Sequence, residues 1–400
     1  MPSLKNWEES SMVEYASIGS LLKRKRNKAK SINCAAPVYA VTNSNGFVLS
    51  SSLHEFTIHS EDTSNYMVVE KNDFAYNPSR LNIGSIAYFK HEAKGLISPM
   101  YVVFHADERK VLPEYLYVVI KSQDVGNKID SLKEVGARFR FDFSRWDLIQ
   151  IPIPSLSEQE RIVGMLDTFT SAIDNLKEQI VQRRKQYEHY RDELLDLEGK
   201  PGVEMKTLGD VARYYRGVTY NKNQEVALNS GGTKIFRANN INLGTNTLNY
   251  DDVKEISKDV RIRDDQWLYK DDILICAGSG SKEHVGKVAY IKQNLDYAYG
   301  GFMGKIVTDD TLDSGYLFHV ISSTLFKDYL KIALNSTTIN NLNSTLVNNF
   351  LFPIPSLSEQ ERIVGMLDTF TKSIANLEAQ LKEREKQYEY YRNKLLTFEK

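Results

Sequence analysis

Cysteine is scarce in this chain of 400 residues, which contains only Cys34 and Cys276. Two thiols so far apart have neither the spacing of a zinc site nor the number needed for a disulfide framework. No run of about 18 apolar residues is present, so the sequence predicts no membrane-spanning helix. The first residues, MPSLKNWEESSM, lack the basic and then apolar pattern of a signal peptide. We therefore expect a protein of the reducing cytoplasm.

The chain also lacks an excess of either charge, with a formal net charge of −1. This balance does not indicate nucleic-acid binding, which is often accompanied by a basic composition, although local charge or a partner can supply phosphate contacts. Apolar residues make up 42% of the sequence, which excludes a disordered chain. The length predicts two or three domains.

Complete catalytic motifs are missing as well. Residues 280–287, GSKEHVGK, have one residue too many between the glycines for a phosphate-binding loop, and Val288 follows instead of Ser or Thr. The run Asn77-Pro78-Ser79-Arg80 departs from the Asn/Asp-Pro-Pro-aromatic site of amino-methyltransferases at its last two positions. The histidines have no metal-ligand spacing. The sequence therefore predicts no catalysis and no metal or cofactor of its own.

An internal repeat is the clearest feature of the sequence. Residues 152–170 read PIPSLSEQERIVGMLDTFT, and residues 353–371 read the same, letter for letter. The likeness continues more loosely from Gln179 and Gln380, whereas the blocks at about 25–145 and 215–345 differ. The chain is thus organised as variable block, repeat, variable block, repeat. Such an exact repeat would also permit exchange of blocks by recombination.

Each repeat predicts one long helix. Ser157 with Glu160, and Ser358 with Glu361, have the spacing of a capping box. Apolar residues then follow with steps of four and three, a heptad seam that predicts a coiled coil about 60 Å long. The seam consists of Ile162, Leu166, Phe169, Ile173, Leu176, Ile180 and Tyr187 in the first repeat, and Ile363, Leu367, Phe370, Ile374, Leu377, Leu381 and Tyr388 in the second.

The simplest partner for each apolar seam is the seam of the other helix. Antiparallel pairing would bury both and give the molecule an internal pseudo-twofold repeat; pairing with another protein or with a second copy is the alternative. Arg183 and Arg384 interrupt the seams at equivalent positions. They either fix the register of the helices or turn their charge outward to solvent.

The variable blocks predict mixed α/β domains, because short β-branched and aromatic runs alternate with Gly, Asn and Asp. Expected strands are 66–69, 85–89, 101–104, 273–276, 287–291 and 304–307, and expected helices are 113–121 and part of 314–332. The shared opening and closing motifs indicate one fold for both blocks. Their divergent interiors indicate that the blocks bind different ligands.

This order of parts resembles the specificity subunits of type I restriction–modification enzymes. IPIPSLSEQERIVGMLD from Ile151 and FPIPSLSEQERIVGMLD from Phe352 are similar to the Pro-Leu-x-Glu-Gln element that opens each spacer helix of that family. The stretches from Val69 to Ile86, from Gly95, and from Lys270 look like parts of its target-recognition domains.

The resemblance implies an α+β protein in which two target-recognition domains are separated by two long helices paired as an antiparallel coiled coil. The domains would be 1–154 and 201–355, and the spacer helices 155–200 and 356–400. Each domain would read one half of a bipartite target in double-stranded DNA. Two methyltransferase subunits and the endonuclease/translocase subunits would be the partners, and they would carry S-adenosylmethionine and ATP with Mg²⁺.

Residues for DNA contact are suggested by side-chain chemistry alone. Arg and Lys neutralise phosphates, and Arg and Asn pair with guanine and adenine edges. The candidates in the first block are Lys23, Arg24, Lys25, Arg26, Asn77, Ser79, Arg80, Arg138 and Arg140. Those in the second block are Arg213, Tyr215, Arg216, Arg237, Asn239, Asn240, Ser279 and Lys282, with the polar segment 335–349. An ordinary turn or a solvated surface explains each residue equally well.

Two other functions remain open from the sequence. A duplicated coiled-coil adaptor would bind two protein partners and no DNA, and so would show no salt-sensitive DNA binding. An enzyme of an unrecognised type would need a cofactor or metal pocket in one block.

Overall fold

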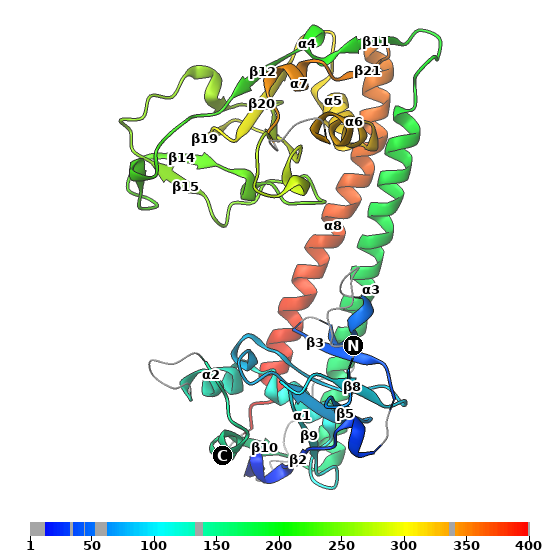
Figure 1. The fold of residues 1–400 in the computed structure, drawn as a ribbon, viewed down its shortest axis with the longest axis vertical. Helices are drawn as coiled ribbons and strands as arrows, with labels where there is room; N and C mark the ends of the chain where they lie inside the picture. The colour runs from blue at the N-terminus through cyan, green and yellow to red at the C-terminus, as the bar shows by residue number, and fades with distance from the viewer. Residues whose placement is uncertain are drawn as a thin grey trace, which may run out of the picture. The chain divides into compact units, whose positions relative to one another are not determined.

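The computed structural model describes residues 13–32, 35–43, 45–52, 62–132, 139–335 and 341–398, without the side chains of residues 282 and 335. The chain forms two compact units (Figure 1). The first unit comprises Met1–Leu176 with Gln380–Lys400, and the second comprises Lys177–Ala379. Each unit therefore contains one variable block and a segment from each of the two long helices.

The two repeats form the longest helices, α3 (Leu156–Leu195) and α8 (Leu357–Leu395). Within the first unit the ring of Phe169 stacks on Tyr391, with centroids 5.1 Å apart. Within the second unit Tyr190 stacks on Phe370 at 5.4 Å. Because Phe169 and Phe370 are equivalent in the repeat, as are Tyr190 and Tyr391, the helices exchange the same contact in both units.

The helices run antiparallel, as predicted. In the second unit, Tyr190 contacts Phe370 while Arg184, earlier on α3, forms an ion pair with Glu378, later on α8. The fourteen seam residues are buried or half-buried in their own units. Arg384 is exposed and donates to Gln387 at 2.9 Å, which fits the outward interpretation of that position. The predicted fold class, with its repeated α/β domains and coiled coil, is confirmed.

The helix starts differ from the predicted ones. α3 begins at Leu156, and the carbonyl of Ser155 accepts hydrogen bonds from the backbone N–H groups of Glu158 and Gln159. The Ser155 hydroxyl also accepts from the Glu158 N–H at 3.3 Å. The cap is thus Ser155, and Ser157 lies inside the first turn, so the predicted pairing of Ser157 with Glu160 was wrong. In the second repeat Ser356 takes the same place before α8.

The described residues of the first unit form three sheets. They are β1 (Glu14–Ser17) with β10 (Gln150–Ile153); β2 (Leu22–Lys25), β9 (Val102–Ala106), β6 (Asp73–Tyr76) and β7 (Ile86–Tyr88) in that order; and β4 (Gly46–Leu49), β3 (Val38–Thr42), β8 (Gly95–Ile97) and β5 (Met67–Val69). Neighbouring strands are antiparallel except β3 and β8, which are parallel. The described part of the unit also has two short α-helices, α1 (Pro113–Ile120) and α2 (Gln123–Ser131).

The second unit repeats this topology in its described residues, with one additional strand in the third sheet. Its sheets are β11 (Glu204–Thr207) with β21 (Leu351–Ile354); β12 (Ala212–Arg216), β20 (Met303–Thr308), β17 (Ile273–Cys276) and β18 (Val288–Tyr290); and β13 (Glu225–Val226), β15 (Lys254–Ile256), β14 (Thr233–Phe236), β19 (Leu295–Tyr299) and β16 (Trp267–Leu268). Its shorter helices are α4 (Leu208–Val211), α5 (Ser314–Ser322), α6 (Thr324–Asn335) and α7 (Ser344–Asn348). The expected strands and helices of both blocks therefore form, and most of their ends lie within one or two residues of the expected positions.

A short antiparallel pair holds each block to the start of its long helix. β10 pairs with β1, and β21 pairs with β11, so the proline-containing strand before each helix is fixed by the strand that opens the block. Helices α1 and α5 are packed by apolar residues into the same cores as the long helices, since Leu116 and Ile162 belong to the first core and Leu317 and Ile363 to the second. This packing makes a continuous core within each unit.

Candidate nucleic-acid interface

One edge of the four-stranded sheet collects the candidate residues in each unit. In the first unit, β2 ends next to Arg26, and the turn after β6 contains Asn77 and Arg80. In the second unit, β12 ends at Arg216, and the turn after β17 contains Ser279. The strand registers match, since Ala75 faces Val103 and Leu274 faces Lys305. The two blocks thus place different residues on equivalent positions of one scaffold.

A buried aspartate fixes the turn before β6 and before β17. The carboxylates of Asp73 and Asp272 each accept from the backbone N–H three residues earlier, at 2.8 Å. Both are buried, and each has a lysine partner: Lys25 lies 2.6 Å from Asp73, and Lys305 lies 3.1 Å from Asp272. Lys25 also contacts Glu70 at 2.7 Å. The ammonium group of Lys25 is therefore engaged within the protein.

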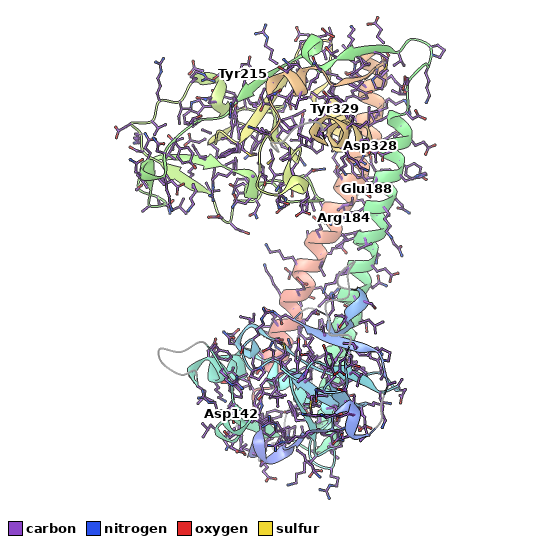
Figure 2. All side chains as sticks on the ribbon, viewed as in Figure 1. Asp142, Arg184, Glu188, Tyr215, Asp328 and Tyr329 are labelled. Atoms are coloured by element: carbon purple, nitrogen blue, oxygen red, sulfur yellow. The ribbon has the colours of Figure 1, made fainter. Side chains whose placement is uncertain are left out.

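The other cations of β2 face solvent. Lys23, Arg24 and Arg26 are exposed, and the guanidinium of Arg24 lies 5.8 Å from the ring centroid of Phe143. Hydrogen bonds from Ser144, together with Arg24 and Arg140, lower the pKa of Asp142. Asp142 is labelled in Figure 2. The first unit therefore presents several exposed cations at this edge with one carboxylate among them.

The turn after β6 divides the predicted residues. Asn77 accepts from the backbone N–H of Ser79 at 2.9 Å and donates to the Met100 sulfur at 3.9 Å, so its side chain supports the turn. Ser79 and Arg80 are exposed. The carbonyl of Pro78 accepts from the N–H of Phe141 at 2.9 Å, which brings the exposed Arg140 to the same edge. Arg138 lies outside the described residues.

In the second unit, β12 supplies Arg213, Tyr215 and Arg216. Arg213 and Arg216 are exposed, and Arg216 Nε donates to the carbonyl of Gly301 at 3.3 Å. Tyr215, labelled in Figure 2, is half-buried with its ring centroid 5.7 Å from Lys305 Nζ. Arg216 therefore remains available to a phosphate while it holds the turn that contains Gly301.

The turn after β17 carries the next candidates. Ser279 is half-buried, and Lys282 opens a short 3-10 turn, but its side chain lies outside the described residues. The carbonyl of Ala277 accepts from the N–H of Leu342, which is equivalent to the contact of Pro78 with Phe141. This contact places Asn341, from the polar segment 335–349, at the same edge; residues 336–340 of that segment are outside the described part.

Arg237, Asn239 and Asn240 belong to a different part of the second unit. Arg237 forms an ion pair with Asp252 at 2.8 Å, and Asn239 donates to the same carboxylate at 2.7 Å. Asn240 is fully buried; it accepts from the Arg237 N–H and donates to the Asn249 carbonyl. These three side chains are engaged in maintaining the loop after β14, the strand whose last residue, Phe236, accepts a hydrogen bond from the Gly300 N–H.

Two residues at this edge were missed by sequence reasoning. Met100 and Phe302 are 62% and 70% exposed. They stand at equivalent positions of the turns that enter β9 and β20, since the N–H of Tyr101 donates to Ser98 and that of Met303 donates to Gly300. The dipeptides before them, Ser-Pro and Gly-Gly, signal a turn. The signal does not reveal that the apolar side chain faces solvent.

The second unit also contains a cavity of about 580 Å³ beside the long helices. Its apolar lining includes Tyr187, Phe318 and Leu330, and its charged lining includes Arg184 and Glu188. Figure 2 labels Arg184 and Glu188 on α3, with Asp328 and Tyr329 on the neighbouring helix α6. The described residues include no group of three or more His, Cys, Asp or Glu placed to hold a metal ion. None of the described helices is long and apolar enough to cross a membrane.

Comparisons with known proteins agree with this architecture. The model of the type I restriction modification DNA specificity domain matches residues 5–183 and again residues 201–386. The EcoR124I/EcoR124II specificity subunit of Escherichia coli is 30% identical over 78% of this chain and 77% of its own length. The EcoKI specificity subunit of E. coli K12 is 29% identical over 43% of this chain and 37% of its own.

A solved structure supports the fold independently. The S subunit of a type I restriction-modification system from M. genitalium superposes with a TM-score of 0.57 at 15% identity, and 99% of each chain is covered. At that identity the likeness establishes the fold alone. Together with the twofold match to the family model, these relationships show that the chain belongs to the type I restriction–modification DNA specificity subunits.

Proposed function

We propose that each unit of this specificity subunit reads one half of a bipartite target in double-stranded DNA. The chain is non-catalytic, like the specificity subunits of its family. The edge that begins at Arg26 in the first unit and at Arg216 in the second is the reading surface. Arginines at the strand ends contact phosphates, and side chains on the turns contact bases.

The observation that carries this proposal is that equivalent positions of the two units have side chains of different chemistry. Arg80 corresponds to Ser279, and Arg140 corresponds to Asn341, whereas Arg26 and Arg216 are the same residue type. A shared cation suits the phosphate backbone, which is the same in every sequence. The differing side chains suit two different half-site sequences.

The long helices carry out the part of the function that does not depend on the DNA sequence. Residues Leu156–Thr170 of α3 and Leu357–Thr371 of α8 are identical, so we propose that these segments dock two copies of the same methyltransferase subunit. Each helix has about 40 residues and is therefore about 60 Å long. We propose that the pair sets the distance between half-sites, which lie on one face of DNA when about 34 Å apart.

The chemistry belongs to partners in this proposal. The methyltransferase subunits bind S-adenosylmethionine, and the endonuclease/translocase subunits bind ATP and Mg²⁺. This chain contributes DNA recognition and assembly only. The cavity beside α3 in the second unit is one surface on which a partner could pack.

Methylation mapping tests the proposal directly. Cells with this chain and its methyltransferase are compared with cells that lack only this chain. A chain-dependent bipartite motif with a fixed gap is expected, and replacing block 215–345 should change one half of the motif while the other half stays. An active methyltransferase with no chain-dependent methylation would reject the proposal and favour a protein adaptor.

A further inference from the structure

Met100 and Phe302 are large apolar side chains held in solvent by a rigid part of the fold. Each lies at the third position of a turn that carries the chain from one sheet of its unit to the other, from β8 to β9 or from β19 to β20. Both flanking strands are paired, so the ends of the turn are fixed on two sides. An exposed apolar residue on a fixed turn gains nothing for folding.

Hydrogen bonds hold the Phe302 turn closed. The Phe302 carbonyl accepts from the N–H groups of Ala277 and Gly278, both at 2.9 Å. Gly301 is held by the guanidinium of Arg216. A Cβ on Gly278 would lie 3.2 Å from the Phe302 ring, so a larger residue there would require the ring to shift by a few tenths of an ångström. The backbone that carries the aromatic ring is therefore positioned before any ligand arrives.

The surroundings of both side chains are polar and cationic. In the first unit, Met100 touches Asn77, whose turn carries the exposed Arg80. In the second unit, Phe302 lies beside Arg216 and next to the turn of Ser279. An apolar side chain near an exposed arginine complements a stacked, negatively charged polymer. It does not resemble a protein interface, whose centre is depleted of charge.

The sequence of this edge also favours DNA over a protein partner. A surface that binds two copies of one protein should be the same in both units, as the segments Leu156–Thr170 and Leu357–Thr371 are. The edge instead differs at every turn position while it keeps an apolar residue at the tip. Phe and Met are both among the side chains that enter base steps and unstack them.

We propose that Met100 and Phe302 are apolar wedges, each of which enters a base step in the half-site read by its own unit. The inference rests on the proposed function and adds an element to it. Besides the edges of the bases, each unit recognises how easily one base step unstacks. Flexible pyrimidine–purine steps open at the least cost and are the expected partners of the wedges.

Fluorescence of 2-aminopurine tests the wedge in the complete complex with its methyltransferase subunits. The probe is placed at successive positions of the mapped target, outside the base that is methylated. The unaltered complex should raise the fluorescence at one step in each half-site. Phe302→Ala should abolish the rise in one half-site only and weaken binding about tenfold, and Met100→Ala should do so in the other half-site.

Two further variants control for stability and chemistry. Phe302→Leu keeps an apolar wedge and should retain most of the fluorescence rise. Ile332→Ala removes a side chain that is 75% exposed on α6, outside the turns that form the edge, and should change neither signal. Equal thermal unfolding of all four variants shows that each is folded.

The outcomes separate the wedge from the wider proposal. If the complex methylates its bipartite target and Phe302→Ala neither lowers fluorescence nor weakens binding, the wedge is wrong and the proposed function stands. If Phe302→Ala releases the methyltransferase subunit instead, the tip is a protein contact and the wedge is again wrong. If the unaltered complex recognises no bipartite target, the proposed function itself fails.

Discussion

The side-chain carbonyl of Gln360 accepts a hydrogen bond from the backbone N–H of Asp313 at 2.8 Å, which fastens the start of α8 to the start of α5. The amide nitrogen of Gln360 donates to the carbonyls of Thr311 and Pro355. In the first unit the equivalent Gln159 has the same set of partners, at Leu112, Lys110 and Pro154. The glutamine of the repeat is therefore a buried contact between block and helix, apart from its effect on the helix start.

Replacing Gln360 with Ala should lower the free energy of unfolding of the second unit by about 2–4 kcal/mol, because buried backbone groups lose their partners. Urea denaturation followed by circular dichroism measures the change. Gln182→Ala, on the exposed surface of α3, is the matched control and should cost less than about 0.5 kcal/mol. Equal stability of the two variants would show that water replaces the amide of Gln360.

The buried ion pair of Lys305 and Asp272 gives a second prediction. The Lys305 ammonium also donates to the Trp267 carbonyl at 2.8 Å, and both charged residues are almost fully buried. Lys305→Met leaves a buried carboxylate without its counter-ion, so it should cost about 3–5 kcal/mol at pH 8. Burial raises the pKa of Asp272, and protonation removes the unpaired charge, so the cost should be smaller at pH 5.

Lys25 provides the comparison for Lys305. Its ammonium is partly exposed and lies between Asp73 and Glu70. Lys25→Met should cost less than Lys305→Met in the same denaturation experiment, because Asp73 keeps His105 at 3.1 Å and Glu70 keeps Lys94 at 2.8 Å. A larger loss for Lys25→Met would show that these remaining partners do not compensate the two carboxylates.

The repeat made the helices and their pairing predictable. Heptad spacing continued over both repeats, so the buried face of each helix could be read directly from residues such as Ile162 and Ile363. The helix start was not predictable, because the run SLSEQE offers two overlapping Ser-x-x-Glu patterns, from Ser155 and from Ser157. The tertiary contacts of Gln159 favour the first pattern, and local sequence does not contain them.

The candidate site was predictable only in part. Residue type identified Arg26, Arg80 and Arg216 but also Asn240, whose amide is buried and holds a loop. Whether a side chain is exposed depends on neighbouring strands that are distant in sequence. Phe302 could be found only from the register of β17 with β20, because an aromatic residue beside a strand is more often part of a core.

His319 joins the second block to both long helices and should make its stability depend on pH. Its Nδ1 is hydrogen-bonded to the Tyr187 hydroxyl on α3 at 2.9 Å, and its Nε2 lies 3.8 Å from the Asp368 carboxylate on α8. Burial lowers the pKa of His319 below its ordinary value of 6.5, although Asp368 acts in the opposite direction. The folded unit therefore holds the neutral imidazole.

The sign of the pH effect follows from this difference in pKa. As the pH falls below 6.5, the unfolded chain takes up a proton that the folded unit refuses, so stability is present above that pH and is lost as the pH falls further. His319→Gln should unfold with a weaker pH dependence between about pH 7 and pH 5. Thermal unfolding across this range measures the effect, and identical slopes for both proteins would contradict it.

Tyr187 and Tyr388 are equivalent in the repeat, so a comparison of their variants tests the contact of His319 with α3. Tyr187→Phe removes the partner of the buried imidazole and should cost about 1–3 kcal/mol. Tyr388 packs in the first core, where α1 has Val118 at the position of His319. Tyr388→Phe should therefore cost less than Tyr187→Phe when both are measured by urea denaturation.

Arg26 and Arg216 should contribute to the salt dependence of DNA binding. If each neutralises one phosphate, Arg26→Ala should reduce the slope of log Kobs against log salt concentration by about 1. Arg216→Ala should reduce the slope equally and also weaken binding at high salt, because its guanidinium holds the Gly301 carbonyl and thereby the turn of Phe302. Arg362→Ala, whose partner is Glu359 on the exposed surface of α8, should leave the slope unchanged. A slope unaffected by Arg26→Ala, with target recognition intact, would place the phosphate contacts of the first unit elsewhere on its basic strand.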